Sequence, residues 1–467
     1  MGKAAKQGIM NSINSYIGVG LGALNTMILF PRIFSDNPEF MGSVNLLLAY
    51  STLFAAFGHL GIPQSVIKYF PQFSEEDRGK FLSSGLWLAG LMSVGLLVFS
   101  LLAGANITHS WPFLAILGGS MLFYEIFASV SHIHKKTTYP IFLKNVGRRI
   151  LLLSVLLAEF FLDLTEVEFL WLLAIGYILH AVLMMIYAAK DLPPLRFSFD
   201  VSKYSVQWIY GVFIVLSVSL DVLVSRLDII MIGEYLDNAQ VAFYSIAFFV
   251  GSVVSIPSKS LVTSLRPYIS ESWAQGDTES LKRLYTRGAE VQLLVNTMVF
   301  FLIAINAQAI NQFLPDTYEI DPMVIFAIGL GQIVLGGTGP SAMILIISKS
   351  YRLNFVLGLV MVGLSIGLNA WLIPQMGIRG AAVATLFSVI IYEILKLIVL
   401  QQQYKMNPLS RNYLWALLGV GLYVVAAYYL PQVDYSLYDF PVISNLVGIS
   451  VLLMGGYFIK TKLASFE

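Results

Sequence analysis

Apolar segments of about 20 residues follow one another along most of the chain, and short polar stretches separate them. A helix rises about 1.5 Å per residue, so such a segment crosses the roughly 30 Å hydrocarbon core of a bilayer. A hydropathy window of about 19 residues therefore predicts fourteen membrane-spanning helices. The predicted spans are 12–34, 41–66, 81–103, 112–133, 143–163, 168–189, 207–232, 240–264, 288–310, 322–347, 354–374, 378–401, 411–430 and 441–460.

Basic residues gather at alternate ends of these spans. With a cytoplasmic N-terminus, every Lys and Arg except Arg32, Arg226 and Arg379 lies at or near the cytoplasmic side, and the outer connections carry mainly acids. One missed or extra helix would invert every later connection and destroy this asymmetry. The positive-inside rule therefore predicts fourteen spans with both termini in the cytoplasm. The fifth span is the weakest of them, because Lys144, Arg148 and Arg149 occupy its first turns.

Composition agrees with a protein of the membrane. The 467 residues are 57% hydrophobic and 12% charged, against about 45–50% and about 25% in soluble domains. There is no cysteine, and the connections are too short for a soluble catalytic domain, which needs at least about 50 residues. Phosphate-binding loops and serine-nucleophile motifs are missing. We expect no enzymatic activity, no cofactor, no metal site and no nucleic-acid partner.

A faint internal repeat suggests how the helices are grouped. Asp77 and Asp277 precede the third and ninth spans, and Asp36 and Asp237 precede the second and eighth, so the offset is roughly 200 residues. An offset of six helices keeps the orientation of both halves in the membrane. The all-α fold is therefore predicted to contain two six-helix lobes, 1–204 and 205–405, related by a pseudo-two-fold axis along the membrane normal. Residues 406–467 add a C-terminal helix pair.

The seventh span carries charged residues at membrane depth. Asp221, Arg226 and Asp228 lie there, and each ionised side chain costs roughly 2.5–3.5 kcal/mol unless it faces protein or a wet cavity. The two acids share one helical stripe with Ser217 and Ser225, whereas Arg226 points away from it. Its counter-charge must come from another helix or from a ligand. A structural ion pair and a polar transport pathway both remain open.

Two helix breaks are predicted beside polar residues. His59 lies just before Gly61 and Pro63 in the second span, and Pro257 precedes Lys259 in the eighth. Proline interrupts the helical hydrogen bonds, and freed carbonyl groups are tolerated where they line a cavity. Both His59 and Lys259 are therefore candidates for a translocation pathway, although Lys259 also suits a contact with lipid headgroups.

Other charged residues have simpler interpretations. Glu125 lies in the fourth span with no partner in its own helix, which favours a protonated or cavity-facing carboxyl group. Glu393 and Lys396 are three residues apart in the twelfth span and are expected to pair with each other. Arg32 follows Pro31 at the outer end of the first span, where its side chain can extend to the interface.

Three segments resemble a known family. Residues 369–385, NAWLIPQMGIRGAAVAT, are similar to a hairpin motif of the Wzx-like polysaccharide flippases, which belong to the multidrug/oligosaccharidyl-lipid/polysaccharide (MOP) exporter superfamily. The segments 57–69, FGHLGIPQSVIKY, and 226–233, RLDIIMIG, resemble its second and seventh helices. In this hairpin, Gly and Ala let the next helix pack closely.

The resemblance implies a monomeric flippase in the bacterial inner membrane. It would move undecaprenyl-pyrophosphate-linked oligosaccharide from the inner to the outer leaflet by alternating access, for O-antigen, capsule or exopolysaccharide assembly. Such flippases have a central cationic cavity and no bound nucleotide, which gives roles to Arg226 and Arg32; a lipid II flippase would have more arginines. The resemblance also implies membrane-lipid contacts, H⁺ or Na⁺ as coupling ion, and a lipid-tail groove at the last two spans.

Two other classes of function remain open. A MATE-like cation- or proton-coupled drug antiporter would need carboxylates at a cation site, and Glu125, Asp221 and Asp228 are available for it. A lipid-bound scaffold or enzyme of polysaccharide assembly is the third class. The missing catalytic motifs and the missing soluble domain weigh against it.

Overall fold

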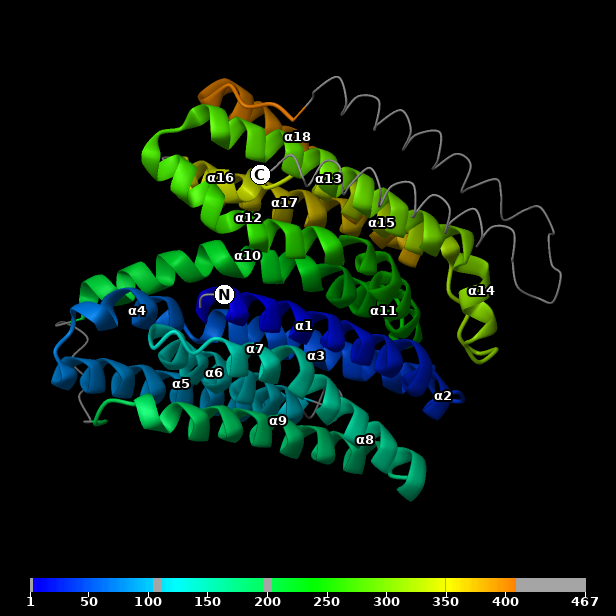
Figure 1. Cartoon of the computed structure of the whole chain (residues 1–467). Helices are drawn as coiled ribbons and strands as arrows, with labels where there is room; N and C mark the ends of the chain where they lie inside the picture. Colours follow the sequence, from blue (N-terminus) through cyan, green and yellow to red (C-terminus); the bar gives the residue numbers. More distant parts are fainter. Residues whose placement is uncertain (1–2, 104–110, 196–203, 349, 409–467) are drawn as a thin grey trace. The chain divides into compact units, whose positions relative to one another are not determined.

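The computed structural model describes residues 3–103, 111–195, 204–348 and 350–408 (Figure 1). Helices joined by short connections make up this described part, and it contains no strand. Ten of its helices are long and apolar enough to cross a membrane, and one bent helix pair gives an eleventh candidate. The predicted spans 411–430 and 441–460 lie outside the described residues. Residue contacts divide the chain into two units, Met1–Gly233 and Glu234–Glu467.

Besides two short 3₁₀ turns, the described part of the first unit contains ten α-helices and two π-helical turns. In chain order they are α1 (Lys3–Ala23), a π turn (Leu24–Leu29), α2 (Phe30–Ile33), α3 (Pro38–Gly58), α4 (Ile62–Tyr69), α5 (Glu75–Ala103), α6 (Trp111–Ile133), α7 (Thr138–Phe142), a second π turn (Leu143–Gly147), α8 (Arg148–Leu162), α9 (Glu166–Ala188) and α10 (Ser205–Tyr235).

Helix α6 is the centre of the first unit. It packs against α3, α4, α5 and α9, and it is the most deeply buried of the candidate spans in the described part. Small residues allow this close packing: a Cβ atom on Gly118 would lie 2.8 Å from the ring of Phe54 on α3. Close approach of backbones at small residues is the usual way in which membrane helices associate.

The fifth predicted span is helical but interrupted by a π turn. Helices α7 and α8 flank the turn Leu143–Gly147, so the chain stays helical from residue 138 to 162. This segment is not among the apolar spanning candidates, because it carries Lys144, Arg148 and Arg149 within two turns. The turn packs against α1, where Gly18 approaches the Asn145 carbonyl group. Turns of this kind are frequent at functional sites.

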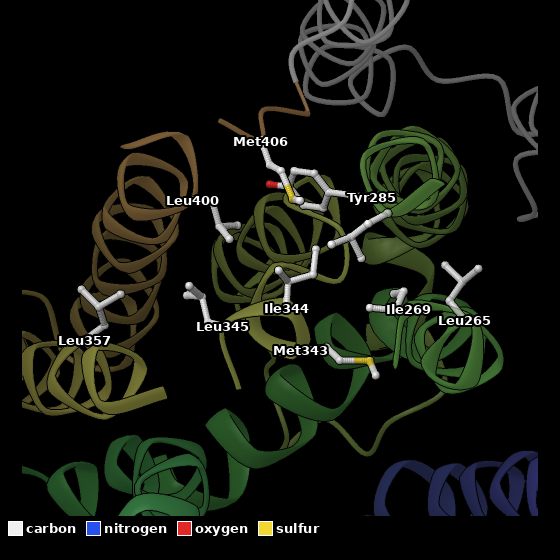
Figure 2. Close-up of a cluster of buried hydrophobic side chains, with 10 residues drawn as sticks. Leu265, Ile269, Tyr285, Met343, Ile344, Leu345, Leu357, Leu400 and Met406 are labelled. Atoms are coloured by element: carbon white, nitrogen blue, oxygen red, sulfur yellow. The ribbon is translucent and has the colours of Figure 1, made fainter. Parts of the chain in front are cut away.

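The second unit is organised around α15. The α-helices of its described part are α11 (Asn238–Ser252), α12 (Ile256–Gln275), α13 (Thr278–Ile305), α14 (Ala307–Gln312), α15 (Pro322–Gly337), α16 (Ser341–Ile347), α17 (Tyr351–Met376) and α18 (Ile378–Tyr404). Helix α15 packs against α11, α13 and α18. Figure 2 shows a neighbouring apolar cluster, in which Ile269, Tyr285, Ile344 and Leu400 are almost completely buried. Helix α6 is the fourth predicted span and α15 begins the tenth. The two central helices are thus six spans apart, which is the offset of the predicted internal repeat.

The two helix breaks predicted from the sequence differ in how strongly they interrupt the helix. Helix α3 ends at Gly58 and α4 begins at Ile62, with positive φ angles of 45° at Leu60 and 75° at Gly61, so the predicted break is confirmed. At the second break, only the short 3₁₀ turn Val253–Ser255 separates α11 from α12, and the whole segment from Asn238 to Gln275 qualifies as one span.

The connection between the predicted spans 240–264 and 288–310 is almost entirely helical. Helices α12 and α13 fill nearly all of it, and only Gly276 and Asp277 lie between them. Gly276 ends α12 with a φ of 71°, a conformation that favours glycine. Asp277 then caps α13 by accepting a hydrogen bond from the Ser280 amide at 3.0 Å. Hydrogen bonds with Ser280 also lower the pKa of the Asp277 carboxyl group.

A third break separates α15 from α16, which meet at an angle of 50°. Thr338 lies at this break and donates a hydrogen bond to Glu393 Oε2 at 2.5 Å. Lys396 Nζ lies 2.7 Å from Glu393 Oε1, and the two side chains are 4% and 1% exposed. The predicted pairing of Glu393 with Lys396 is therefore confirmed, and the pair is linked to the broken helix.

Helix α10 packs against the second predicted span. Residue contacts assign it to the first unit as far as Gly233, whereas the predicted lobe boundary falls at 204/205. Ser65 donates to the Gln207 carbonyl group at 2.9 Å, and Ser219 donates to the Ala56 carbonyl group at 2.8 Å. Between them, a Cβ atom on Gly61 would lie only 2.0 Å from the Gly211 oxygen.

The Gly61 contact gives the first prediction. Gly61→Ala introduces a clash with Gly211 and a side chain at positive φ, so we expect a loss of at least about 1–3 kcal/mol of stability. Thermal unfolding of the purified protein in detergent measures it. Gly90→Ala is the control, because no atom lies within 4 Å of its added Cβ. Equal melting temperatures for both variants would contradict this account.

The buried ion pair gives the second prediction. Lys396→Met leaves the Glu393 carboxylate without its counter-charge, and breaking a buried pair costs about 3–5 kcal/mol. Adding Glu393→Gln removes the unpaired charge, so the double variant should recover much of the loss. Thermal unfolding of the single and double variants tests this, and a double variant no more stable than Lys396→Met would refute it.

Candidate functional site

Four basic residues of the first unit form a cationic cluster. Lys144 lies in the second π turn, Arg148 and Arg149 begin α8, and Arg226 lies on α10. Their positive charges are concentrated in a bundle of apolar helices, where ionised groups need an opposite charge or hydrogen-bond acceptors. The partners of each residue therefore decide what the cluster can bind.

Lys144 is neutralised by α6. Its Nζ atom lies 2.8 Å from Glu125 Oε1, and the two side chains are 49% and 31% exposed. Glu125 has no partner in its own helix, but the fifth predicted span supplies one, and this ion pair argues against the predicted protonated carboxyl group. This pair removes one positive charge from the cluster and gives the Glu125 carboxylate a fixed counter-ion.

Arg149 is held by backbone groups of the first predicted span. Its Nη1 atom donates to the Gly18 carbonyl group at 2.7 Å, and the Arg149 carbonyl group accepts a hydrogen bond from Asn25 at 2.8 Å. Asn25 itself lies in the first π turn. These contacts tie α8 to α1, which gives Arg149 a structural role within the cluster.

Arg148 lies over an aromatic pair. Its guanidinium carbon is 5.3 Å from the centroid of the Tyr124 ring, a distance typical of a cation–π contact. The Tyr124 ring also stacks on His180 of α9, with centroids 4.4 Å apart. Tyr124 is fixed by its hydroxyl group, which donates to the Pro140 carbonyl group at 2.5 Å. Helices α6, α8 and α9 therefore position Arg148 together.

Arg226 approaches the same region from α10. It interacts electrostatically with Tyr177 of α9 and is repelled by Arg148. The Nε atoms of Arg148 and Arg226 are buried, and neither has a hydrogen-bond partner among the described residues. Neither guanidinium group forms a salt bridge in this part of the chain. Two like charges with unused donors can be satisfied by an anion with several oxygen acceptors, such as a phosphate group.

The structure brings only some of the sequence-predicted residues to this cluster. Arg226 belongs to it, Glu125 pairs with Lys144, and His59 interacts electrostatically with that pair. His59 is 6% exposed, and its Nδ1 atom accepts a hydrogen bond from the Gly61 amide at 3.2 Å. The α3–α4 break is thereby connected to the cluster through its histidine.

The other predicted residues lie elsewhere or differ in exposure. Arg32 is exposed at the end of α2, and Lys259 lies on α12 in the second unit. Asp221 is exposed, whereas Asp228 on the same helix is 3% exposed, and both make interactions of their own. Their predicted roles in translocation stay predictions.

Sequence reasoning missed Arg148, Tyr124, Tyr177 and His180 as site residues. One signal was available, because three basic residues in two turns of a predicted span are costly unless they serve a function. The aromatic residues gave no such signal, since tyrosine and histidine are common in apolar helices and at their ends.

Known structures share this fold. The inward closed conformation of the lipid II flippase MurJ matches 98% of this chain and 100% of its own, with a TM-score of 0.76 and 16% sequence identity. An inward-facing multidrug resistance MATE family transporter of the MOP superfamily matches 88% of this chain and 95% of its own, with a TM-score of 0.58 and 11% identity.

Sequence comparison gives a relative and a family. An uncharacterized membrane protein of Methanocaldococcus jannaschii is 23% identical over 430 residues, which cover 82% of this chain and 81% of that protein. Residues 32–320 match the family model described as polysaccharide biosynthesis protein, which confirms the resemblance found in the sequence. This match covers more than half of the 467 residues, so the chain belongs to the polysaccharide biosynthesis protein family and is a multi-pass membrane protein with a MurJ/MATE-like fold.

Proposed function

We propose that this protein is a flippase for a lipid-linked oligosaccharide that carries a phosphate or pyrophosphate group. One observation carries the proposal: Arg148 and Arg226 present buried, unused hydrogen-bond donors among apolar helices. The family and the fold support a transporter, and the unpaired guanidinium groups add the chemistry of its substrate. The substrate we favour is undecaprenyl-pyrophosphate-linked oligosaccharide for O-antigen, capsule or exopolysaccharide assembly.

Phosphate fits the two arginines for geometric and electrostatic reasons. A guanidinium group offers several N–H donors in one plane, and phosphate oxygens can accept two of them at once. Arg148 and Arg226 repel each other. A bound dianion would attract both guanidinium groups and so offset this repulsion. Lys144 contributes less, because Glu125 already balances its charge.

Transport then requires that the bound group face each leaflet in turn. We propose alternating access, with the anion held by the cationic cluster while the oligosaccharide passes to the outer leaflet. Asp228, Asp221, Arg32 and Lys259 keep their predicted places along this pathway, and H⁺ or Na⁺ remains the predicted coupling ion. The inner membrane of a bacterium and cytoplasmic termini are part of the same proposal.

The pairing of Glu125 weighs against a drug antiporter that uses this carboxylate. An antiporter site needs a carboxylate that can exchange a proton or cation for the drug. Glu125 has a lysine ammonium group at 2.8 Å as its fixed counter-ion. An anionic substrate therefore suits the first unit better than a cationic one.

Substitution of the two arginines tests the substrate chemistry. Arg148→Gln and Arg226→Gln each remove a charged donor to the phosphate, and hydrogen bonds to charged groups contribute about 1.5–3 kcal/mol, so transport should fall about 10- to 100-fold. The measurement is the transfer of polyprenyl-pyrophosphate-linked oligosaccharide between leaflets of proteoliposomes. Arg283→Gln is the control, because that arginine is 59% exposed on α13. Wild-type transport rates in both cluster variants, at equal reconstitution, would rule out this role.

A deletion strain tests the function in the cell. Loss of the protein should leave one lipid-linked oligosaccharide on the inner leaflet while the matching surface glycan disappears, because synthesis continues and export stops. Extraction and analysis of lipid-linked sugars, with leaflet accessibility assayed in spheroplasts, gives the result. Unchanged glycans together with new sensitivity to cationic drugs would contradict the proposal and favour the antiporter.

A further inference from the structure

An apolar groove of about 420 Å³ runs between α8 and α9. Ile150, Ser154 and Ala158 line it on α8, and Ile175, Leu179 and Leu183 line it on α9. The small side chains of Ser154 and Ala158 leave room for the groove. Ile175 and Leu179 are 56% and 55% exposed, although both lie on a helix that qualifies as a membrane span.

One end of this groove meets the cationic cluster. Its lining there consists of Leu143, Gly147 and His180, and the first two are the chain neighbours of Lys144 and Arg148. The other residue, His180, is 3% exposed and stacks on Tyr124, over which Arg148 lies. The stacked rings of His180 and Tyr124 thus link the groove to the Arg148 guanidinium group.

His180 has a hydrogen-bond acceptor to spare, because its other ring nitrogen must donate to a carbonyl oxygen. Its Nε2 atom lies 3.0 Å from the Leu143 carbonyl oxygen, while its buried Nδ1 atom has no hydrogen-bond partner among the described residues. An unpaired buried polar atom is costly, so the site is suited to a ligand with a polar group at this depth. The apolar groove and the cationic cluster at its end together match an amphiphile with an anionic head.

We propose that the groove between α8 and α9 holds the polyprenyl chain of the lipid carrier while the cationic cluster binds its phosphate. This assignment rests on the proposed function and adds the path of the lipid tail. The occupant is the single isoprenoid chain attached to the bound phosphate, since the groove begins beside the cationic cluster. From Gly147 to Ala158 the groove follows α8 for about 16 Å, at 1.5 Å per residue.

The groove acts on encounter and orientation rather than on hydrophobic affinity. A polyprenyl chain enters the groove from the hydrocarbon of the bilayer, not from water. The hydrophobic effect therefore contributes nothing to binding, and only packing contacts are gained. A chain held beside the cluster nevertheless presents its phosphate at a high effective concentration. Blocking the groove should therefore raise the substrate concentration for half-maximal transport more than it lowers the maximal rate.

Two adjacent residues of α9 provide a matched pair of variants. Leu179 lines the proposed groove, whereas Ile178 lines a second apolar groove of about 470 Å³ between α5, α6 and α9. Both are exposed, at 55% and 46%. In proteoliposomes, Leu179→Trp should raise the half-saturating concentration of lipid-linked oligosaccharide roughly five-fold or more, and Ile178→Trp should change it little. Equal effects of the two variants, or no effect of Leu179→Trp, would overturn the assignment.

Photolabelling tests the groove without any transport assay. A polyprenyl phosphate with a diazirine on its chain should label peptides of α8 and α9 in the full-length wild-type protein. Unlabelled polyprenyl phosphate should prevent the labelling, and phosphatidylglycerol should not. Labelling confined to residues 409–467, equal labelling of the second groove, or equal competition by phosphatidylglycerol would overturn the proposal. A wild-type protein that is labelled at α8 and α9 but transports nothing would refute the proposed function and leave the groove assignment intact.

Discussion

An ionised side chain inside an apolar helical bundle must find an opposite charge or enough hydrogen-bond partners, and this requirement organises both units. The second unit satisfies it internally. Glu393 and Lys396 neutralise each other, Thr338 adds a hydrogen bond at the α15–α16 break, and both charged side chains are almost completely buried. Such a closed pair has no need of a ligand. Its cost of desolvation is met by partners that belong to the protein.

The first unit leaves the same requirement open. Arg149 has backbone acceptors and Lys144 has Glu125, but Arg148 and Arg226 keep buried donors without a partner among the described residues. The Tyr124 ring lies beneath Arg148 in a cation–π contact, which does not neutralise the guanidinium charge. A bound phosphate group would complete the arrangement that Glu393 completes in the second unit. This difference is the physical basis for assigning an anionic substrate to a fold that also serves drug transporters.

Breaks in the helices place these polar groups at membrane depth. The α3–α4 break brings His59 near the Glu125–Lys144 pair, the π turn before α8 carries Lys144, and the α15–α16 break exposes Thr338 to Glu393. A regular helix satisfies its own backbone hydrogen bonds, whereas a break in a membrane leaves backbone groups that need other partners. The irregular segments thus coincide with the charged side chains in both units.

The sequence by itself determined ten apolar spans of the described part and a broken eleventh, the sharp break at Gly61, the Glu393–Lys396 pair and the family. Each of these depends on residues that are neighbours in the chain: an apolar run of about 20 residues must span as a helix, and side chains three apart share a helix face. Only the tertiary structure decided that Lys144 neutralises Glu125, and that Arg148 and Arg226 approach each other beside Tyr177. These contacts depend on how each helix is rotated and which helix it packs against. Hydropathy does not encode those choices, because most faces of a membrane helix are equally apolar.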